Sequence, residues 1–175
     1  MSVGYWAVLV FAPAYLQQNQ GLSTDQAGAA MLAATLPMAI LPTVGAALAG
    51  RWGWRRTLTL GMALVSLGIA IVAWTAVVGG ALTTALIGFG LAGCGGAFIN
   101  SQLSGALVAF APPERAGTAS AVATTLRQGG FAIGVALLGA AAGVGSHPYA
   151  ASFLIAATAA ALGALAAWTL IRTGS

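Results

Sequence analysis

One cation and three side-chain amides interrupt the long apolar stretches of this sequence. They are Arg127, Gln128, Asn100 and Gln102. An ionised side chain within apolar sequence is expensive to place in a low-dielectric environment, so it normally faces a protein interior or a wet cavity and has a partner there. The amides lie at a depth comparable with that of the cation if both stretches are helices across one bilayer. We therefore expect the four side chains to line one polar pocket that contacts a substrate.

A structural role for Arg127 stays open beside this one. A long basic side chain can extend its charged end towards the nearer membrane surface while its methylene stem stays in lipid. It can also donate hydrogen bonds to the free carbonyls at a helix end, which would make it a clamp rather than a substrate ligand. The residue types alone do not decide between these roles.

Aromatic residues near the start of the chain are a second group of pocket candidates. Tyr5, Trp6 and Tyr15 all occur in the first apolar stretch. Their rings can form the wall of a pocket for a hydrophobic compound, whereas aromatic residues near membrane boundaries more often anchor a helix at the interface. We include all three as candidates for the substrate pocket and keep anchoring as the alternative.

The remaining reactive residues are too few for the common catalytic and metal sites. Asp25 and Glu114 stand in polar segments, so no carboxylate lies within an apolar stretch. One histidine, His147, and one cysteine, Cys94, cannot supply a metal-ligand set or an intrachain disulfide. The sequence has no lysine, which excludes the phosphate-binding loop Gly-x4-Gly-Lys. We expect no enzyme activity, no metal and no cofactor.

The composition indicates that these residues are positioned by membrane helices. Hydrophobic residues make up 59% of the 175 residues and charged residues only 5%, against roughly 25% charged residues in a soluble domain. The net charge of +4 comes from sparse arginines without interleaved aromatic residues, so it does not indicate a nucleic-acid surface. We expect an all-α, polytopic protein whose surroundings are the lipid bilayer.

Polar and turn-forming clusters divide the chain into six apolar segments. A helix needs roughly 20 apolar residues to cross a bilayer. The predicted spans are 2–16, 27–49, 57–78, 81–110, 117–144 and 149–171. The second segment carries Pro37 and Pro42, and both predict kinks because proline removes a helix hydrogen bond.

The distribution of arginine predicts the orientation of these spans, because short loops that carry arginine are retained in the cytoplasm. If the chain crosses six times, the arginines outside the apolar segments all fall on one side: Arg51, Arg55, Arg56, Arg115 and Arg172. We expect both termini to be cytoplasmic and the protein to be integral to the cell (inner or plasma) membrane.

Glycines at a spacing of four residues mark the fifth segment. They form two pairs, Gly130 with Gly134 and Gly139 with Gly143. Because lipid gives apolar helices no hydrophobic drive to associate, small residues serve to let two backbones approach closely. We expect these glycines to pack against a neighbouring helix, and their sliding during a transport cycle stays open as a second role.

Three segments of the sequence carry a resemblance to a known family. They are Tyr15-Leu16-Gln17-Gln18 with Gly21-Leu22-Ser23 and Ala27-Gly28; Ala49-Gly50-Arg51-Trp52-Gly53-Trp54-Arg55-Arg56; and Pro112-Pro113-Glu114-Arg115-Ala116-Gly117-Thr118-Ala119-Ser120 with Arg127-Gln128-Gly129-Gly130. They resemble, in order, the seventh-to-eighth helix region, the second copy of the cytoplasmic loop motif and the segment entering the eleventh helix of major facilitator superfamily transporters. The likeness is greatest to the drug:proton antiporter branch.

The loop motif matches at four positions and departs at one. Arg51, Gly53, Arg55 and Arg56 stand where the motif has its basic residue, glycine and paired basic residues. Gly50 stands where the motif often has Asp. The charge relay that the Asp makes with the basic residues in the family is therefore not implied here.

The resemblance covers residues 1–175 as the C-terminal six-helix half of a transporter, a single domain of two inverted three-helix repeats. It implies half of a secondary active transporter that exports small organic or drug-like compounds by alternating access. Its partners would be a small-molecule substrate and an N-terminal six-helix half, missing or on a separate chain, or a second copy of this chain. A coupling acid would then lie on the other half. A non-transporting membrane scaffold or sensor, or an inactive fragment, is the alternative.

Overall fold

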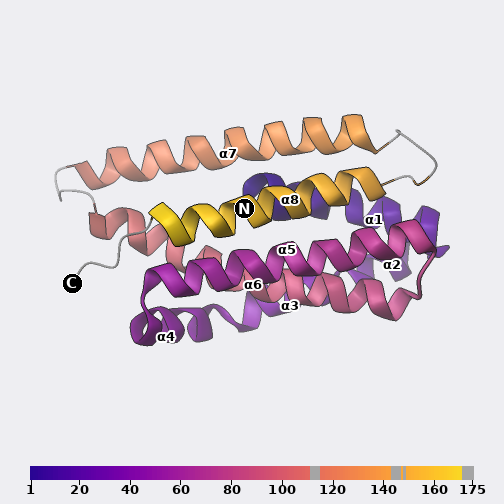
Figure 1. Cartoon of the computed structure of the whole chain (residues 1–175), viewed down its shortest axis with the longest axis horizontal. Helices are drawn as coiled ribbons and strands as arrows, with labels where there is room; N and C mark the ends of the chain where they lie inside the picture. Colours follow the sequence, from indigo (N-terminus) through magenta and orange to yellow (C-terminus); the bar gives the residue numbers. More distant parts are fainter. Residues whose placement is uncertain (111–114, 143–146, 148, 171–175) are drawn as a thin grey trace.

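The structure of the chain is a computed structural model that describes residues 1–110, 115–142, 147 and 149–170. Every regular element within these ranges is a helix (Figure 1). The elements are a π-helix η1 (Ser2–Trp6) and the α-helices α1 (Ala7–Gln20), α2 (Thr24–Ala30), α3 (Leu32–Ile40), α4 (Pro42–Trp52), α5 (Trp54–Val78), α6 (Leu82–Phe110), α7 (Ala116–Ala141) and α8 (Ala150–Leu170). The expected all-α fold is therefore found throughout the described residues.

Four helices are long and apolar enough to cross a bilayer. They are α5, the part Leu82–Asn100 of α6, the part Gly117–Ala141 of α7, and α8. A fifth span arises if the helices over Thr24–Ile40 and Pro42–Trp52, which meet at a bend of 50°, count as one broken span. The first expected span, 2–16, is not among them, because its residues are divided between the five-residue η1 and the 14-residue α1. The described helices thus give four spans, or five with the bent pair, and do not confirm the six expected.

Local sequence explains where several of these helices end. Gly21 and Gly79 adopt left-handed φ values of 68° and 64° directly after α1 and α5, a conformation that glycine reaches without a Cβ penalty. Ser23 and Gln26 form a capping box that starts α2, because each side chain bonds a free backbone N–H of the first turn. Pro42 begins α4, and its missing N–H accounts for the break of the second span at Leu41.

The helix α5 lies between α6 and α8 and forms the closest packing in the bundle. Its small residues Gly61 and Gly68 face Gly95 and Gly88 of α6. A Cβ atom on Gly68 would lie 2.5 Å from the backbone N of Ala92 and nearer still to the Gly88 carbonyl oxygen. The two backbones are therefore in direct contact, as is usual where apolar helices associate without a hydrophobic drive.

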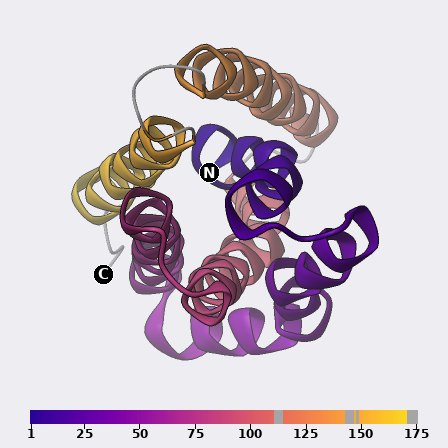
Figure 2. The ribbon, with the colours of Figure 1, turned by 90° about the vertical axis from the view of Figure 1, so that its right-hand side faces the viewer.

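The helix α7 is the least covered of the long helices. Only 11% of an apolar stretch of 18 residues in α7 is buried, against 44% of such a stretch in α5 and 56% in α6. The end-on view in Figure 2 shows α7 on the outside of the bundle, beside the first helices and α8. It contacts η1, α1, α6 and α8 with one side. The opposite side carries exposed residues such as Val122, Leu126 and Ile133, so a broad apolar surface of α7 has no neighbour among the described residues.

Candidate functional site

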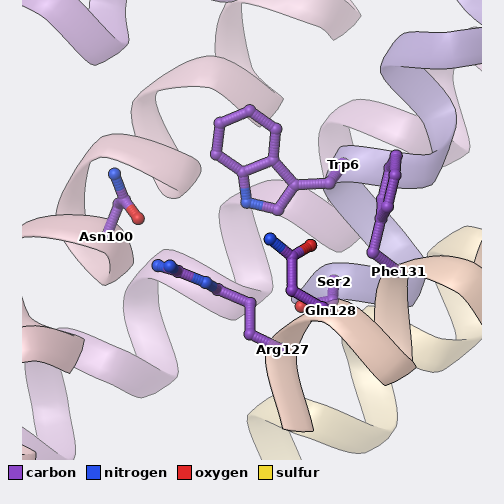
Figure 3. A pocket seen from close by; sticks show the side chains of 6 residues that line it. All are labelled: Ser2, Trp6, Asn100, Arg127, Gln128 and Phe131. Atoms are coloured by element: carbon purple, nitrogen blue, oxygen red, sulfur yellow. The ribbon is translucent and has the colours of Figure 1, made fainter. Parts of the chain in front are cut away.

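A pocket of about 310 Å³ opens between η1, α6 and α7. Its lining side chains are Ser2, Trp6, Asn100, Arg127, Gln128 and Phe131 (Figure 3). In Figure 3, Arg127 and Gln128 rise from α7 into the space beside the Trp6 ring, and Asn100 faces them from the opposite side. One cation, two amides, one hydroxyl and two aromatic rings therefore surround one small volume.

The glycines of α7 place Arg127 beside η1. A Cβ on Gly134 would lie 2.8 Å from the Cα of Val3 and 2.9 Å from the Cβ of Ala7, and one on Gly130 would lie 3.3 Å from the Cβ of Ser2. Because these glycines lack side chains, α7 and η1 come close enough for Arg127 to share a pocket with the η1 side chains.

The second glycine pair lies further along α7. A Cβ on Gly139 would lie 3.3 Å from the Cζ atom of the Phe11 ring. Gly143 falls outside the described residues. The described glycines of the motif therefore all face the first two helical segments of the chain, η1 and α1.

The guanidinium of Arg127 is exposed and makes no hydrogen bond or ion pair with any other described residue. Among these residues the only acid is Asp25, which lies in the first turn of α2 and is itself exposed. In the described part of the chain, Arg127 donates no hydrogen bond to a helix-end carbonyl, so the clamp role has no support there. The five N–H donors of this cation are thus free to bind a ligand in the pocket.

Tyr5 and Gln102 are buried and are not among the residues that line the pocket. Tyr5 is 1% exposed, and its hydroxyl donates a hydrogen bond of 2.9 Å to the carbonyl oxygen of Ala34 on α3. Its ring meets that of Trp6 edge-on, with 5.7 Å between the ring centroids. Gln102 lies on α6 and is 5% exposed. Tyr5 therefore acts as support for the Trp6 side chain that does line the pocket.

Tyr15 lies elsewhere in the core. Its hydroxyl is 2.9 Å from Oγ1 of Thr75 and accepts a hydrogen bond of 3.3 Å from Nε2 of Gln20. Its ring packs edge-on against Phe153 and Tyr149, with centroids 5.2 Å and 6.3 Å away. These contacts tie the end of α1 to α5 and α8, so the structure does not bring Tyr15 together with Arg127.

Two residues that line the pocket were not among the sequence candidates. Phe131 follows Arg127 by four positions, and Ser2 precedes Trp6 by four positions. Side chains four apart lie on the same face of a helix. Helical periodicity around the two predicted residues was therefore the signal that could have found both.

The arginines of the loop motif lie around the junction of α4 and α5. Gly53 joins these helices with φ 80° and ψ 160°, a conformation that L-residues with a Cβ rarely adopt. Arg51 and Arg56 are exposed, whereas the Cζ of Arg55 lies 4.0 Å from the centre of the Trp168 ring on α8. This cation–π contact joins the first turn of α5 to the last turns of α8.

Comparison with known proteins adds three findings. Residues 1–174 match the Major Facilitator Superfamily. The chain is 29% identical over 134 residues to the "Multidrug resistance protein Stp" of Mycobacterium tuberculosis. The aligned region covers 77% of this chain and 25% of that protein. It is 30% identical over 160 residues to the "Methylenomycin A resistance protein" of Streptomyces coelicolor. This alignment covers 90% of the chain and 34% of that protein. The matched region is thus no more than about a third of the length of either relative.

Proposed function

Because this chain belongs to the major facilitator superfamily, whose model its residues 1–174 match, we propose that it is one half of a secondary active transporter that exports small organic, drug-like compounds. The family and the apolar helices make it an integral membrane protein of a transporter family. Two relatives are named for resistance to drugs or to methylenomycin A, which supports export as the direction and drug-like compounds as the cargo.

The observation that carries the proposal is the pocket at the open side of the bundle. It joins Arg127, a cation without a partner in the described ranges, to amides and aromatic rings. This combination is typical of small-molecule sites, which are mostly apolar with a few placed polar groups. The pocket borders α7, whose outer side is left uncovered by the described helices. A second six-helix bundle placed there would close the pocket and form the central cavity of an alternating-access transporter.

The proposal extends to the arrangement in the membrane. This chain would form one six-helix domain. Its first three-helix repeat would be η1 with α1, the broken span over α2 to α4, and α5; its inverted copy would be α6, α7 and α8. The protein would lie in the cell membrane. The arginines of the α4–α5 junction, Arg115 before α7 and both termini would be on its cytoplasmic side. The partner is an N-terminal half or a second copy of this chain.

A flux measurement tests the function. The chain is reconstituted in proteoliposomes alone and together with the part of the Streptomyces coelicolor relative that lies outside the matched 160 residues, and efflux of fluorescent organic compounds is followed. We expect flux only with the complementary half, since alternating access needs a second bundle opposite the pocket. Flux from the chain alone would favour a homodimer. No flux in either case, with both parts present in the membrane, would support a scaffold or sensor instead.

Cysteine labelling tests the orientation independently of transport. In a Cys94→Ser background, Trp52→Cys at the end of α4 and His147→Cys before α8 each supply one exposed thiol. In whole cells we expect a membrane-impermeant maleimide to label position 147 and to reach position 52 only after the membrane is permeabilised, because the arginine-bearing junction is retained inside. Labelling of both positions in intact cells would contradict the proposed topology.

A further inference from the structure

We propose that the pocket selects organic anions with a flat apolar body, so that a carboxylate of the substrate pairs with Arg127 while its ring lies against Trp6. This inference rests on the proposed transport function and names its substrate class. It follows from three features of the pocket: the sign of its charge, the donors around that charge, and the walls that face it.

The charge in the pocket is positive and unbalanced. Arg127 is the only ionisable residue among the six that line it, and it has no ion pair with any residue in the described ranges. Guanidinium stays protonated at every physiological pH, and its planar fork of donors matches the two oxygens of a carboxylate. A monocation brought into this space would meet a fixed like charge, whereas a carboxylate would gain a charge-assisted, bidentate contact.

Neutral polar groups around Arg127 can complete the coordination of an anion. Gln128 and Asn100 each carry an amide with two N–H donors, and Ser2 carries a hydroxyl donor. Figure 3 shows the ends of Arg127 and Gln128 directed into the same space, with Asn100 opposite. A carboxylate has about four lone-pair sites. The guanidinium fork and one or two of these donors can therefore satisfy it without water.

The walls are flat and at least one of them is held in place. Trp6 is fixed from behind by its edge-on contact with Tyr5, and Tyr5 is tied to α3 by its hydrogen bond to Ala34. Phe131 borders the other side of the pocket. A volume of about 310 Å³ lies at the lower end of the size range of small-molecule pockets. The site therefore suits a compound that has a single ring or two fused rings and bears an acidic group.

Equilibrium dialysis with three probes of one shape tests the inference. The probes are 2-naphthoate, neutral 2-naphthamide and (2-naphthylmethyl)trimethylammonium, and the protein is the full chain in phosphatidylcholine nanodiscs. We expect 2-naphthoate to bind at least about tenfold more tightly than the amide, since one charge-assisted hydrogen bond is worth that factor or more. The ammonium probe should bind most weakly.

Variants of one residue then assign the preference. Arg127→Ala should bring the naphthoate and amide affinities within about twofold of each other. Arg127→Lys should keep part of the difference in affinity because it keeps a point charge. Arg127→Glu should favour the ammonium probe. Arg115→Ala removes the same charge at the start of the same helix, outside the pocket, and should leave the preference unchanged. The thermal midpoint of each variant checks that it is folded.

Several outcomes would overturn the inference. A wild-type chain that binds the ammonium probe as tightly as 2-naphthoate has no anion selectivity, and a preference that survives Arg127→Ala does not come from this cation. Loss of naphthoate binding when phosphatidylglycerol is added to the discs would make the site one for lipid headgroups. None of these results bears on the flux of the assembled halves, so the transport proposal would stand or fall separately.

Discussion

Gly68→Ala should destabilise the chain by about 3 kcal/mol, toward the upper end of the range for overpacking a tight core contact. The added methyl group would lie 2.5 Å from the backbone N of Ala92 and 3.0 Å from its Cα, and closer than either to the Gly88 carbonyl oxygen. Both obstacles are backbone atoms of α6, so no side-chain rotation can relieve them. The helices α5 and α6 must separate, and the packing along their whole contact loosens. Thermal unfolding in detergent, followed by circular dichroism at 222 nm, measures the loss.

The matched control for this substitution is Gly129→Ala. Gly129 also lies in the interior of a long helix, without a positive φ, and a Cβ there would meet nothing within 4 Å. Replacing such a glycine by alanine should stabilise the helix by roughly 0.5–1 kcal/mol. The same chemical change is therefore expected to have opposite signs at the two positions. Equal thermal midpoints for the two variants would show that the backbones of α5 and α6 are not in close contact at Gly68.

The ends of the long helices are the part of the fold that the sequence predicts best. The expected segment 57–78 and the observed α5 both end at Val78, because the glycine pair that follows lets the chain turn through a left-handed conformation. The expected 81–110 and the observed Leu82–Phe110 differ by one residue at the start. A long apolar run bounded by turn residues leaves few alternatives to a helix.

The first two segments could not be divided correctly from the sequence. The sequence predicts that the first span ends at residue 16, yet the polar run 17–20 forms the last turn of α1. Gln20 is helical there because its amide donates hydrogen bonds to Tyr15 and to the carbonyl oxygen of Gly80. Such partners come from tertiary structure, and polarity alone does not reveal them. Of the two prolines expected to kink the second segment, Pro37 lies within α3, and the 50° break falls before Pro42.

The composition of the pocket shows a similar division between local and tertiary information. Arg127, Gln128, Asn100 and Trp6 lie together. The high cost of an isolated charge in an apolar stretch is the signal that predicts a site at Arg127. Tyr15 shares the chemistry of the aromatic candidates but bonds Thr75 in the core. Which face of α1 turns towards α7 depends on the glycine contacts between helices, and no periodicity within α1 alone fixes it.

Arg127→Ala should lower transport of an anionic substrate by the assembled transporter about 10- to 100-fold in efficiency, since hydrogen bonds to a charged group contribute roughly 1.5–3 kcal/mol. The guanidinium has no bond to other described residues, so its removal breaks no internal contact there and the loss should come from the substrate. Initial rates of efflux from proteoliposomes over a range of concentrations separate affinity from turnover.

Charge-matched variants decide whether this effect belongs to the pocket. Arg115→Ala removes one positive charge from the beginning of α7, where the side chain is exposed and lies outside the pocket, and we expect it to keep wild-type efflux. Arg127→Lys keeps the charge but not the planar fork, so it should fall between wild type and Arg127→Ala. If Arg127→Ala changed neither the affinity nor the turnover of the assembled transporter, the cation would not contact the substrate, and the site would have to be sought on the uncovered side of α7.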